Sequence, residues 1–128
     1  MARKTVHSDD APKAIGPYSQ AVQVDAGKMT FLSGQIPLDP KTMEMVTGDV
    51  VAQTEQVMKN LGAVLQAAGL DFSHVVRCTI FLTDLGDFAR VNEVYGRSFP
   101  GAPPARATVQ VSALPRGSKV EIDAIAVS

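Results

Sequence analysis

Arg106 is the residue whose type and setting suggest chemistry most directly. It follows Pro103 and Pro104, whose rings fix their own backbone dihedrals and favour an extended chain at this point. A guanidinium presents five donors in a planar fork that fits the two oxygens of a carboxylate, and it stays charged at physiological pH. The spacing also fits a surface or interface salt bridge, the more common role of an arginine. Arg106 is therefore a candidate for binding a small organic acid, with the salt bridge as the structural alternative.

Glu121 and Tyr18 are candidates for proton transfer and hydrogen bonding beside a ligand. Glu121 is flanked by Val120 and Ile122, which could desolvate its carboxylate and let it take a proton from water. The alternative for Glu121 is an ordinary ion pair with a lysine or arginine across a sheet. Tyr18 could donate a hydrogen bond to a ligand, although an isolated tyrosine more often only packs.

Four further residues bear on a small pocket. Ser33 and Gly34 would let backbone amides approach a ligand closely, because glycine has no side chain. Asn92 does not fit the apolar stripe of its helical segment, so its amide either meets solvent, the usual outcome, or reaches toward a pocket. Cys78 alternates with apolar residues and is more typical of a small buried side chain than of a nucleophile.

The sequence lacks the strong motifs for metals, cofactors and phosphates. One cysteine excludes an intramolecular disulfide, a CxxC redox pair and a multi-cysteine zinc site. His7 and His74 are far apart and have no visible partner for a catalytic triad. A phosphate loop, a dinucleotide-binding fingerprint and an RNA-binding aromatic signature are also missing. We therefore expect neither a metal nor a cofactor.

The composition is that of an ordinary globular protein. With 128 residues, 45% of them hydrophobic, we expect one domain over residues 1–128. The net charge of -1 gives no overall attraction for nucleic acid or for a membrane surface. No segment approaches the roughly 20 apolar residues that span a bilayer, and the N-terminus has no signal-peptide run. We expect a cytoplasmic protein.

The spacing of apolar residues predicts two helices. Residues 49–68 carry an apolar stripe at helical spacing; Asp49 could cap the first turn and Gly69 could close the last one in a left-handed conformation. A second helix is predicted from Leu85 or Asp87 to about Ser98, with Asp84 or Asp87 as its cap.

Two-residue alternation predicts the strands. Val76 to Thr83, Ala105 to Val111 and Val120 to Val127 alternate apolar and polar residues, and residues 21–24 and 29–34 read as a hairpin around residues 25–28. Arg106 and Thr108 then share one strand face. The predicted order is β-β-α-β-α-β-β, an α+β fold. Since two helices can cover only one face of the sheet, we expect the other face, with Phe81, Glu121 and Asp123 among its residues, to contact another subunit.

The motifs of this chain resemble those of the RidA/YjgF reactive-intermediate deaminases over nearly its whole length. AIGPYSQA at residues 14–21 and FLSGQIP at 31–37 are similar to the family's first two motifs, and DFARVN at 87–92 is similar to its second-helix segment. PARATV at residues 104–109, LPRG at 114–117 and VEIDAIA at 120–126 resemble its C-terminal signature in order and spacing.

The resemblance implies a chorismate-mutase-like fold in a homotrimer, with sheets forming a central barrel and a pocket at each subunit interface. It implies that Arg106 grips the carboxylate of a 2-imino acid, that Tyr18, Ser33, Gly34 and Asn92 complete the pocket, and that Glu121 positions or activates water. The implied reaction is hydrolysis of 2-iminobutanoate and 2-iminopropanoate to 2-keto acids and ammonia. Such imines already hydrolyse in water, so the enzyme needs only to orient a water and bind the carboxylate. A sequence with few catalytic motifs is compatible with that reaction.

One position departs from many bacterial members of that family, which carry a cysteine where this chain has Thr108. Thr108 should still line the pocket, but a thiol cannot assist there. Two other functions stay open. The same pocket could bind a 2-keto acid or amino acid without catalysis, or the chain could share the ribonuclease or translation-inhibitor activity reported for some relatives. The absence of a basic stripe counts against an RNA groove.

Overall fold

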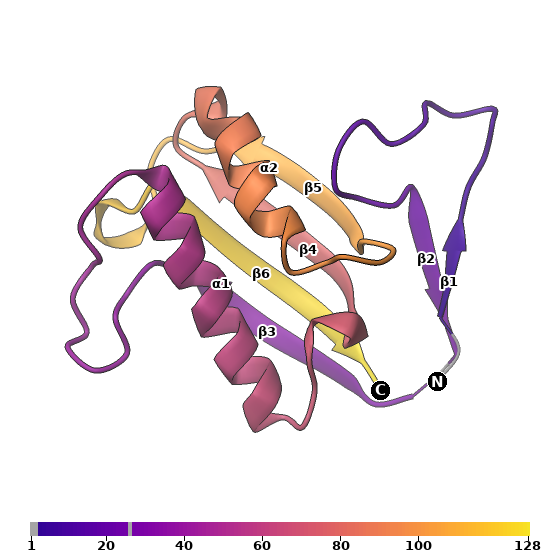
Figure 1. Cartoon of the computed structure of the whole chain (residues 1–128), viewed down its shortest axis with the longest axis horizontal. Helices are drawn as coiled ribbons and strands as arrows, with labels where there is room; N and C mark the ends of the chain where they lie inside the picture. Colours follow the sequence, from indigo (N-terminus) through magenta and orange to yellow (C-terminus); the bar gives the residue numbers. More distant parts are fainter. Residues whose placement is uncertain (1–2, 26) are drawn as a thin grey trace.

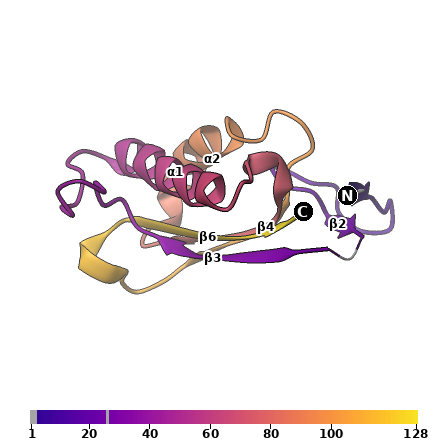
Figure 2. The same ribbon diagram turned by 90° about the horizontal axis from the view of Figure 1, so that it is seen from below.

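A four-stranded sheet with two helices on one face forms the centre of the molecule (Figures 1 and 2). The structure, a computed structural model, describes residues 3–25 and 27–128. In chain order the elements are β1 (Arg3–Val6), β2 (Ala21–Val24), β3 (Met29–Gln35), α1 (Val50–Ala67), β4 (Val75–Leu82), α2 (Phe88–Gly96), β5 (Ala105–Gln110) and β6 (Val120–Val127). Single 3-10 turns lie at Phe72–His74, Leu85–Asp87 and Pro115–Gly117.

The sheet is mixed, with the strand order β3-β6-β4-β5. The pairs β3–β6 and β6–β4 are antiparallel, whereas β4 and β5 run parallel. Parallel neighbours need a crossover connection, and α2 supplies it between β4 and β5. The prediction of an α+β fold with both helices on one face of the sheet is confirmed.

Both helices begin and end close to the predicted residues. Asp49 caps α1 by accepting a hydrogen bond from the amide of Ala52 at 3.1 Å. Gly69 follows with φ +75°, the left-handed conformation that glycine adopts without strain. Asp84 caps the 3-10 turn before α2, while the side chain of Asp87 makes no capping bond.

The hydrophobic core lies between the helices and the sheet. Side chains of α1 and α2 pack against alternate residues of β4 and β6, among them Cys78, Ile80, Ile122 and Ala124. The alternation of β4 was mispredicted at its start, where a bulge between Val75 and Arg77 shifts the register. Val75 is therefore the buried residue in place of Val76.

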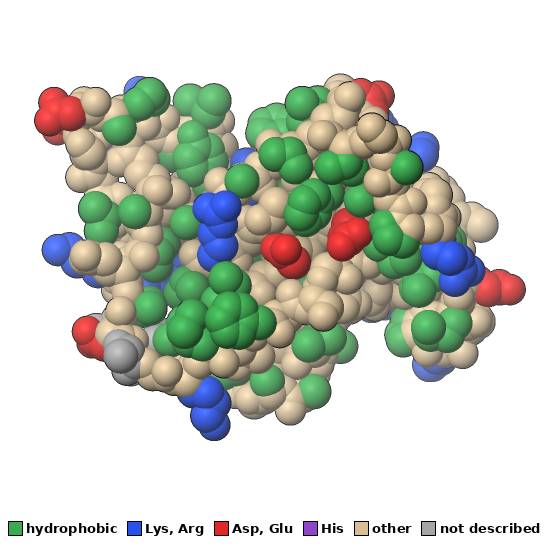
Figure 3. Space-filling view, turned by 180° about the vertical axis from the view of Figure 1, so that it is seen from behind, with side chains coloured by type: hydrophobic (Ala, Val, Ile, Leu, Met, Phe, Trp, Pro, Cys, Tyr) green, Lys and Arg blue, Asp and Glu red, His purple; other side chains and the backbone are tan. Residues whose placement is uncertain are grey.

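The opposite face of the sheet has no helix over it and carries large apolar side chains. Phe31 is 69% exposed and Met29 is 55% exposed. Glu121 and Asp123 point to the same face, because each alternates with the buried residues of β6. Figure 3 shows acidic side chains surrounded by hydrophobic ones in the middle of this face. We call it the uncovered face.

The N-terminal segment differs from the prediction. β1 was not predicted, and it pairs with β2 in a separate two-stranded sheet. In the described residues β2 does not pair with β3, so the predicted hairpin is wrong; its turn, residues 25–28, includes Ala26, which lies outside the described residues. Lys28 instead exchanges two backbone hydrogen bonds with Ser128, which joins the start of β3 to the end of β6.

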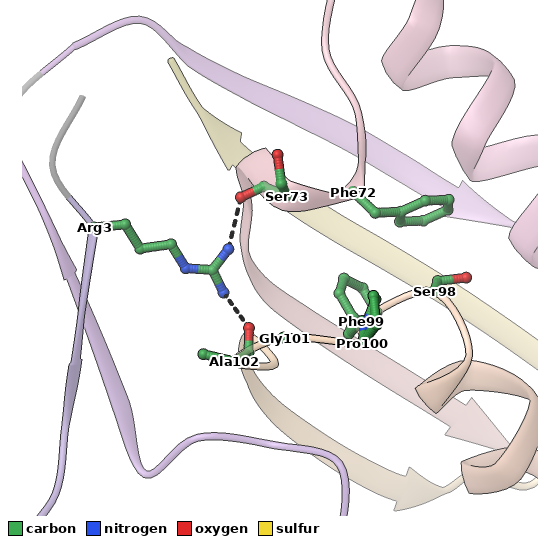
Figure 4. Close-up of a pocket in the computed structure, with 8 residues that line it drawn as sticks. All are labelled: Arg3, Phe72, Ser73, Ser98, Phe99, Pro100, Gly101 and Ala102. Atoms are coloured by element: carbon green, nitrogen blue, oxygen red, sulfur yellow. Dashed lines mark hydrogen bonds between the residues drawn. The ribbon is translucent and has the colours of Figure 1, made fainter.

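Arg3 attaches β1 to the rest of the molecule (Figure 4). Its guanidinium donates to the backbone oxygens of Ser73 at 2.7 Å and of Ala102 at 3.1 Å. A cavity of about 310 Å³ lies beside it, lined mainly by Phe72, Phe99 and the loop 98–102. Within the described chain, the hydrophobic core cluster contains no residue of β1 or β2, so these polar contacts hold the N-terminal sheet in place.

Candidate functional site

Arg106 lies near the start of β5, on the face of the sheet that the helices cover. It is paired in register with Cys78 of β4, and paired residues of neighbouring strands point to the same face. Two hydrogen bonds from Ser19 fix the chain just before β5. The Ser19 amide donates to the Pro104 carbonyl at 3.1 Å, and the Ser19 hydroxyl donates to the Pro103 carbonyl. The N-terminal segment around Tyr18 is thereby placed beside Arg106.

An amide and three aromatic rings surround the Arg106 guanidinium. Its Nη1 donates to Oδ1 of Asn92 at 2.6 Å. Its central carbon lies 5.6 Å from the ring centroids of Tyr18 and Phe88 and 5.2 Å from that of Tyr95. Aromatic faces stabilise a partly desolvated cation without neutralising its charge. The guanidinium is therefore held in place and keeps its full positive charge.

Of the salt-bridge alternatives for Arg106, a surface ion pair within the described chain is wrong, and an ion pair across a subunit interface stays a prediction. Six ion pairs form among residues 3–25 and 27–128, and Arg106 takes part in none of them. Burial lowers the pKa of Arg106 from its ordinary value, but a guanidinium still stays protonated at neutral pH. Within the described chain, the Arg106 guanidinium is therefore half-buried and has no carboxylate partner.

Asn92 and Tyr18 both lie at this cation. For Asn92 solvent was the usual outcome, but its amide contacts Arg106 instead. The Tyr18 ring lies against the guanidinium, and its hydroxyl accepts a hydrogen bond from the amide of Ile15 at 3.3 Å. Thr108, paired with Ile80, points to the same covered face as Arg106, as the alternation predicted. We call Tyr18, Asn92, Arg106 and Thr108 the arginine cluster.

Glu121, Gly34 and Ser33 form a second group on the uncovered face, the glutamate cluster. A bulge in β3 between Leu32 and Gln35 contains Ser33 and Gly34. The Glu121 carboxylate lies directly against Gly34, so closely that a Cβ built on this glycine would stand 2.0 Å from Oε2. Among the described residues Glu121 forms no ion pair. The alternative role for Glu121, an ion pair with a lysine or arginine across the sheet, is therefore wrong within the described chain.

The two clusters face opposite sides of the same sheet. Arg106 is in register with the buried Cys78, whereas Glu121 is in register with Phe81, on the uncovered face. The sequence reasoning placed Arg106 and Glu121 in one pocket, and a single chain does not bring them together. Any site that uses both groups must combine the covered side of one copy with the uncovered side of another.

Sequence reasoning missed Phe88 and Tyr95 as neighbours of Arg106. Both were assigned to the apolar stripe of the second helix, and their helical spacing from Asn92, four and three residues, was the available signal. Cys78 is buried as predicted, and burial raises the pKa of its thiol to about 11, so it stays protonated.

The described residues offer no assembled metal site, because nowhere do three or more histidine, cysteine or acidic side chains gather. None of the helices they form is both long enough and apolar enough to cross a bilayer.

Comparisons with known proteins place this arrangement in a family. The family model described as endoribonuclease L-PSP matches residues 8–128. The chain is 90% identical to "Protein DfrA" of Myxococcus xanthus over 128 residues, covering 100% of this chain and 98% of that one. It is 55% identical to the 2-iminobutanoate/2-iminopropanoate deaminase of Mus musculus over 127 residues, covering 99% and 93% of the two chains.

Solved structures agree with this placement. A putative endoribonuclease from Thermotoga maritima is 53% identical with a TM-score of 0.78, over 98% of this chain and 97% of that one. E. coli TdcF, solved with bound serine, is 45% identical with a TM-score of 0.75, over 98% of each chain. Matches of this identity over the full chain establish common family membership, and the chain belongs to the endoribonuclease L-PSP family, also called the RidA/YjgF family.

Proposed function

We propose that this protein hydrolyses 2-imino acids, 2-iminobutanoate and 2-iminopropanoate above all, to 2-keto acids and ammonia. The observation that carries the proposal is the charged, caged guanidinium of Arg106, which has no carboxylate partner within the described chain. Relatives that are named as deaminases for these two substrates support it. So does TdcF, whose bound serine carries the same carboxylate next to a nitrogen-bearing carbon.

In the proposed reaction Arg106 binds the substrate carboxylate through its fork, while Tyr18 and Asn92 hold the guanidinium. The Glu121 carboxylate of a second copy orients a water and accepts its proton as the oxygen attacks the imine carbon. The same group returns that proton to nitrogen, which gives a carbinolamine. It then takes the proton of the new hydroxyl and passes it to the amino nitrogen, so that the carbon–oxygen double bond forms as the carbon–nitrogen bond breaks and releases ammonia and the 2-keto acid. These steps need no cofactor. The buried free thiol of Cys78 suits a reducing compartment, and we place the reaction in the cytoplasm.

We also propose that the copies assemble as a homotrimer around a central barrel, in which the uncovered face of each copy packs against a neighbour. Two facts favour association: large side chains such as Phe31 are exposed on this face, and the two clusters point to opposite sides of one sheet. A symmetric ring repeats one contact between unlike surfaces, so it can place every Arg106 beside the Glu121 of a neighbour.

Phe31→Asp should split the assembly. Phe31 is 69% exposed in the single chain, so an aspartate there costs the monomer little, but a buried unpaired charge at an interface costs several kcal/mol. Light scattering after gel filtration should give about three times the monomer mass for the wild type and the monomer mass for the variant. Met43→Asp is the matched control, since Met43 is 58% exposed outside the sheet and should leave the trimer intact. A trimeric Phe31→Asp protein would contradict the proposed interface.

Gly34→Ala should displace the Glu121 carboxylate without unfolding the protein. The new Cβ would stand 2.0 Å from Oε2, closer than real contacts allow, so the carboxylate has to move. We expect kcat for imine hydrolysis to fall about tenfold or more, since a displacement near 1 Å can cost up to a hundredfold. Gly101→Ala is the control, because a Cβ at Gly101 meets nothing within 4 Å. Equal kcat values for the two variants would remove Glu121 from the reaction.

The proposed function is tested by adding the purified protein to a pyridoxal-phosphate dehydratase that releases 2-iminobutanoate. Trapping the imine with semicarbazide and following the loss of the adduct measures the hydrolysis rate. The proposal expects faster loss of the imine with the wild-type protein than with buffer. The alternative, a binding protein without catalysis, predicts binding of 2-ketobutyrate in a calorimetric titration together with an unchanged rate.

The description of the matching family model raises ribonuclease action as a further candidate. The net charge of -1 and the acidic pair Glu121 and Asp123 in the middle of the uncovered face give no attraction for a polyanion there. We therefore favour the small-molecule reaction.

A further inference from the structure

The hydroxyl of Tyr95 is a buried polar group that the reaction proposed above does not use. The Tyr95 side chain is 0% exposed, and its oxygen forms no hydrogen bond of normal geometry with another described residue. Its ring packs on Phe99, with the centroids 4.8 Å apart, and lies 5.2 Å from the guanidinium carbon of Arg106. The residue thus joins the hydrophobic core to the arginine cluster.

A second buried hydroxyl without a partner lies on the same face. Oγ1 of Thr108 also forms no hydrogen bond with another described residue, and it stands two positions after Arg106 on β5. Burying a hydroxyl without a partner costs about 1–3 kcal/mol, which is why nearly all such groups in native proteins are satisfied. Two unsatisfied hydroxyls, one on a ring 5.2 Å from the guanidinium carbon and one two positions along β5 on the same covered face, indicate a polar site with an occupant.

Among the described residues, the only side-chain partner that the neighbouring groups offer the Tyr95 hydroxyl is a weak one. The Cys78 thiol lies beside the Tyr95 hydroxyl, but a thiol is only a weak hydrogen-bonding group, and the pKa of about 11 keeps this one uncharged. Burial also raises the pKa of Tyr95 above its ordinary value, so its hydroxyl stays protonated and able to donate. Phenylalanine at this position would pack against Phe99 equally well and would avoid the cost of the buried oxygen.

We propose that Tyr95 is a positioning residue of the arginine cluster: its hydroxyl and that of Thr108 hold buried water beside Arg106, and this water orients the guanidinium for the substrate carboxylate. The inference rests on the proposed function of Arg106, and it identifies the residues that orient the guanidinium on the side of the hydrophobic core. In this arrangement the Asn92 amide on α2 binds the guanidinium on one side. The water bound by the Tyr95 and Thr108 hydroxyls binds it on the side of the hydrophobic core.

Tyr95→Phe tests the proposal because it removes one oxygen and keeps the ring. We expect a melting temperature equal to or above that of the wild type, since a costly buried hydroxyl is gone. We also expect Kd for 2-ketobutyrate, measured by calorimetry, to rise about tenfold, and kcat/KM for imine hydrolysis to fall in proportion. Thr108→Val should change Kd in the same direction. A Kd within twofold of the wild-type value in Tyr95→Phe would overturn the proposal.

Phe99→Leu is the matched control for packing. It removes the ring that stacks on Tyr95 and leaves both hydroxyls, so it should lower the melting temperature and leave Kd near the wild-type value. A crystal structure of the ligand-free wild type gives a readout independent of activity: water within hydrogen-bonding distance of the Tyr95 hydroxyl supports the proposal, and its absence overturns it. If the wild type neither binds 2-ketobutyrate nor hydrolyses imines, the proposed function fails, and this crystallographic result still decides the role of Tyr95.

Discussion

Arg106→Ala should lower kcat/KM for 2-iminobutanoate hydrolysis about a hundredfold or more, because hydrogen bonds to charged groups contribute about 1.5–3 kcal/mol each. The alanine removes both donors of the proposed carboxylate fork together with the charge that the three rings surround. The variant should stay folded, since the guanidinium forms one side-chain hydrogen bond, to Asn92, and no ion pair within the described chain.

Two companion variants separate the role of the fork from general effects of charge. Arg106→Lys keeps the positive charge and loses the planar pair of donors, so its kcat/KM should fall between those of alanine and wild type. Arg90→Ala removes an exposed arginine that pairs with Asp87 and Asp49, and its kcat/KM should match the wild-type value. Full activity in Arg106→Ala, with circular dichroism reporting a folded protein, would contradict the proposal that Arg106 binds the substrate carboxylate.

Glu121→Gln should lower kcat strongly and leave KM nearly unchanged. Proton transfer by a positioned side chain contributes about 10²–10⁴-fold to a rate, and glutamine keeps the size of the side chain without its basicity. Because the carboxylate is not proposed to bind the substrate's own carboxylate, Kd for 2-ketobutyrate should change little. Steady-state rates with a trapped imine, together with a calorimetric titration, measure the two effects separately.

Asp123→Asn is the matched control for a carboxylate on the same strand and face. Asp123 accepts a hydrogen bond from the backbone amide of Thr79 at 3.0 Å, which is a structural task. We expect this variant to lose some thermal stability and to keep most of its kcat. Equal losses of kcat in Glu121→Gln and Asp123→Asn would mean that charge on the uncovered face, and not Glu121 itself, matters for the reaction.

The regular elements could be predicted from the sequence because local rules agree there. The apolar stripe of residues 49–68 has a capping aspartate before it and a left-handed glycine after it, and α1 follows both signals. The alternation in residues 120–127 likewise gave the buried face of β6. Position 76 failed because one bulge shifts the register of β4, and alternation alone carries no signal for a bulge.

The relative placement of the candidate site residues within one chain could not be predicted from the sequence. Strand alternation shows which residues of one strand share a face of the sheet. It does not show which residues of two different strands share a face, because that depends on the pairing register. The pairing of Cys78 with Arg106 and of Phe81 with Glu121 supplies that relation and puts the two clusters on opposite sides. The position of β1 was equally hidden, since Arg3 reaches residues about 70 and 100 positions away along the chain.

The most direct test of the account is complementation between two inactive variants. Copies carrying Arg106→Ala and copies carrying Glu121→Gln, with different affinity tags, are expressed together, and assemblies that hold both tags are purified. If each site takes Arg106 from one copy and Glu121 from the next, every mixed trimer regains one of its three sites, and imine hydrolysis reappears at about a third of the wild-type rate. Mixed assemblies as inactive as either parent would contradict a site shared between copies.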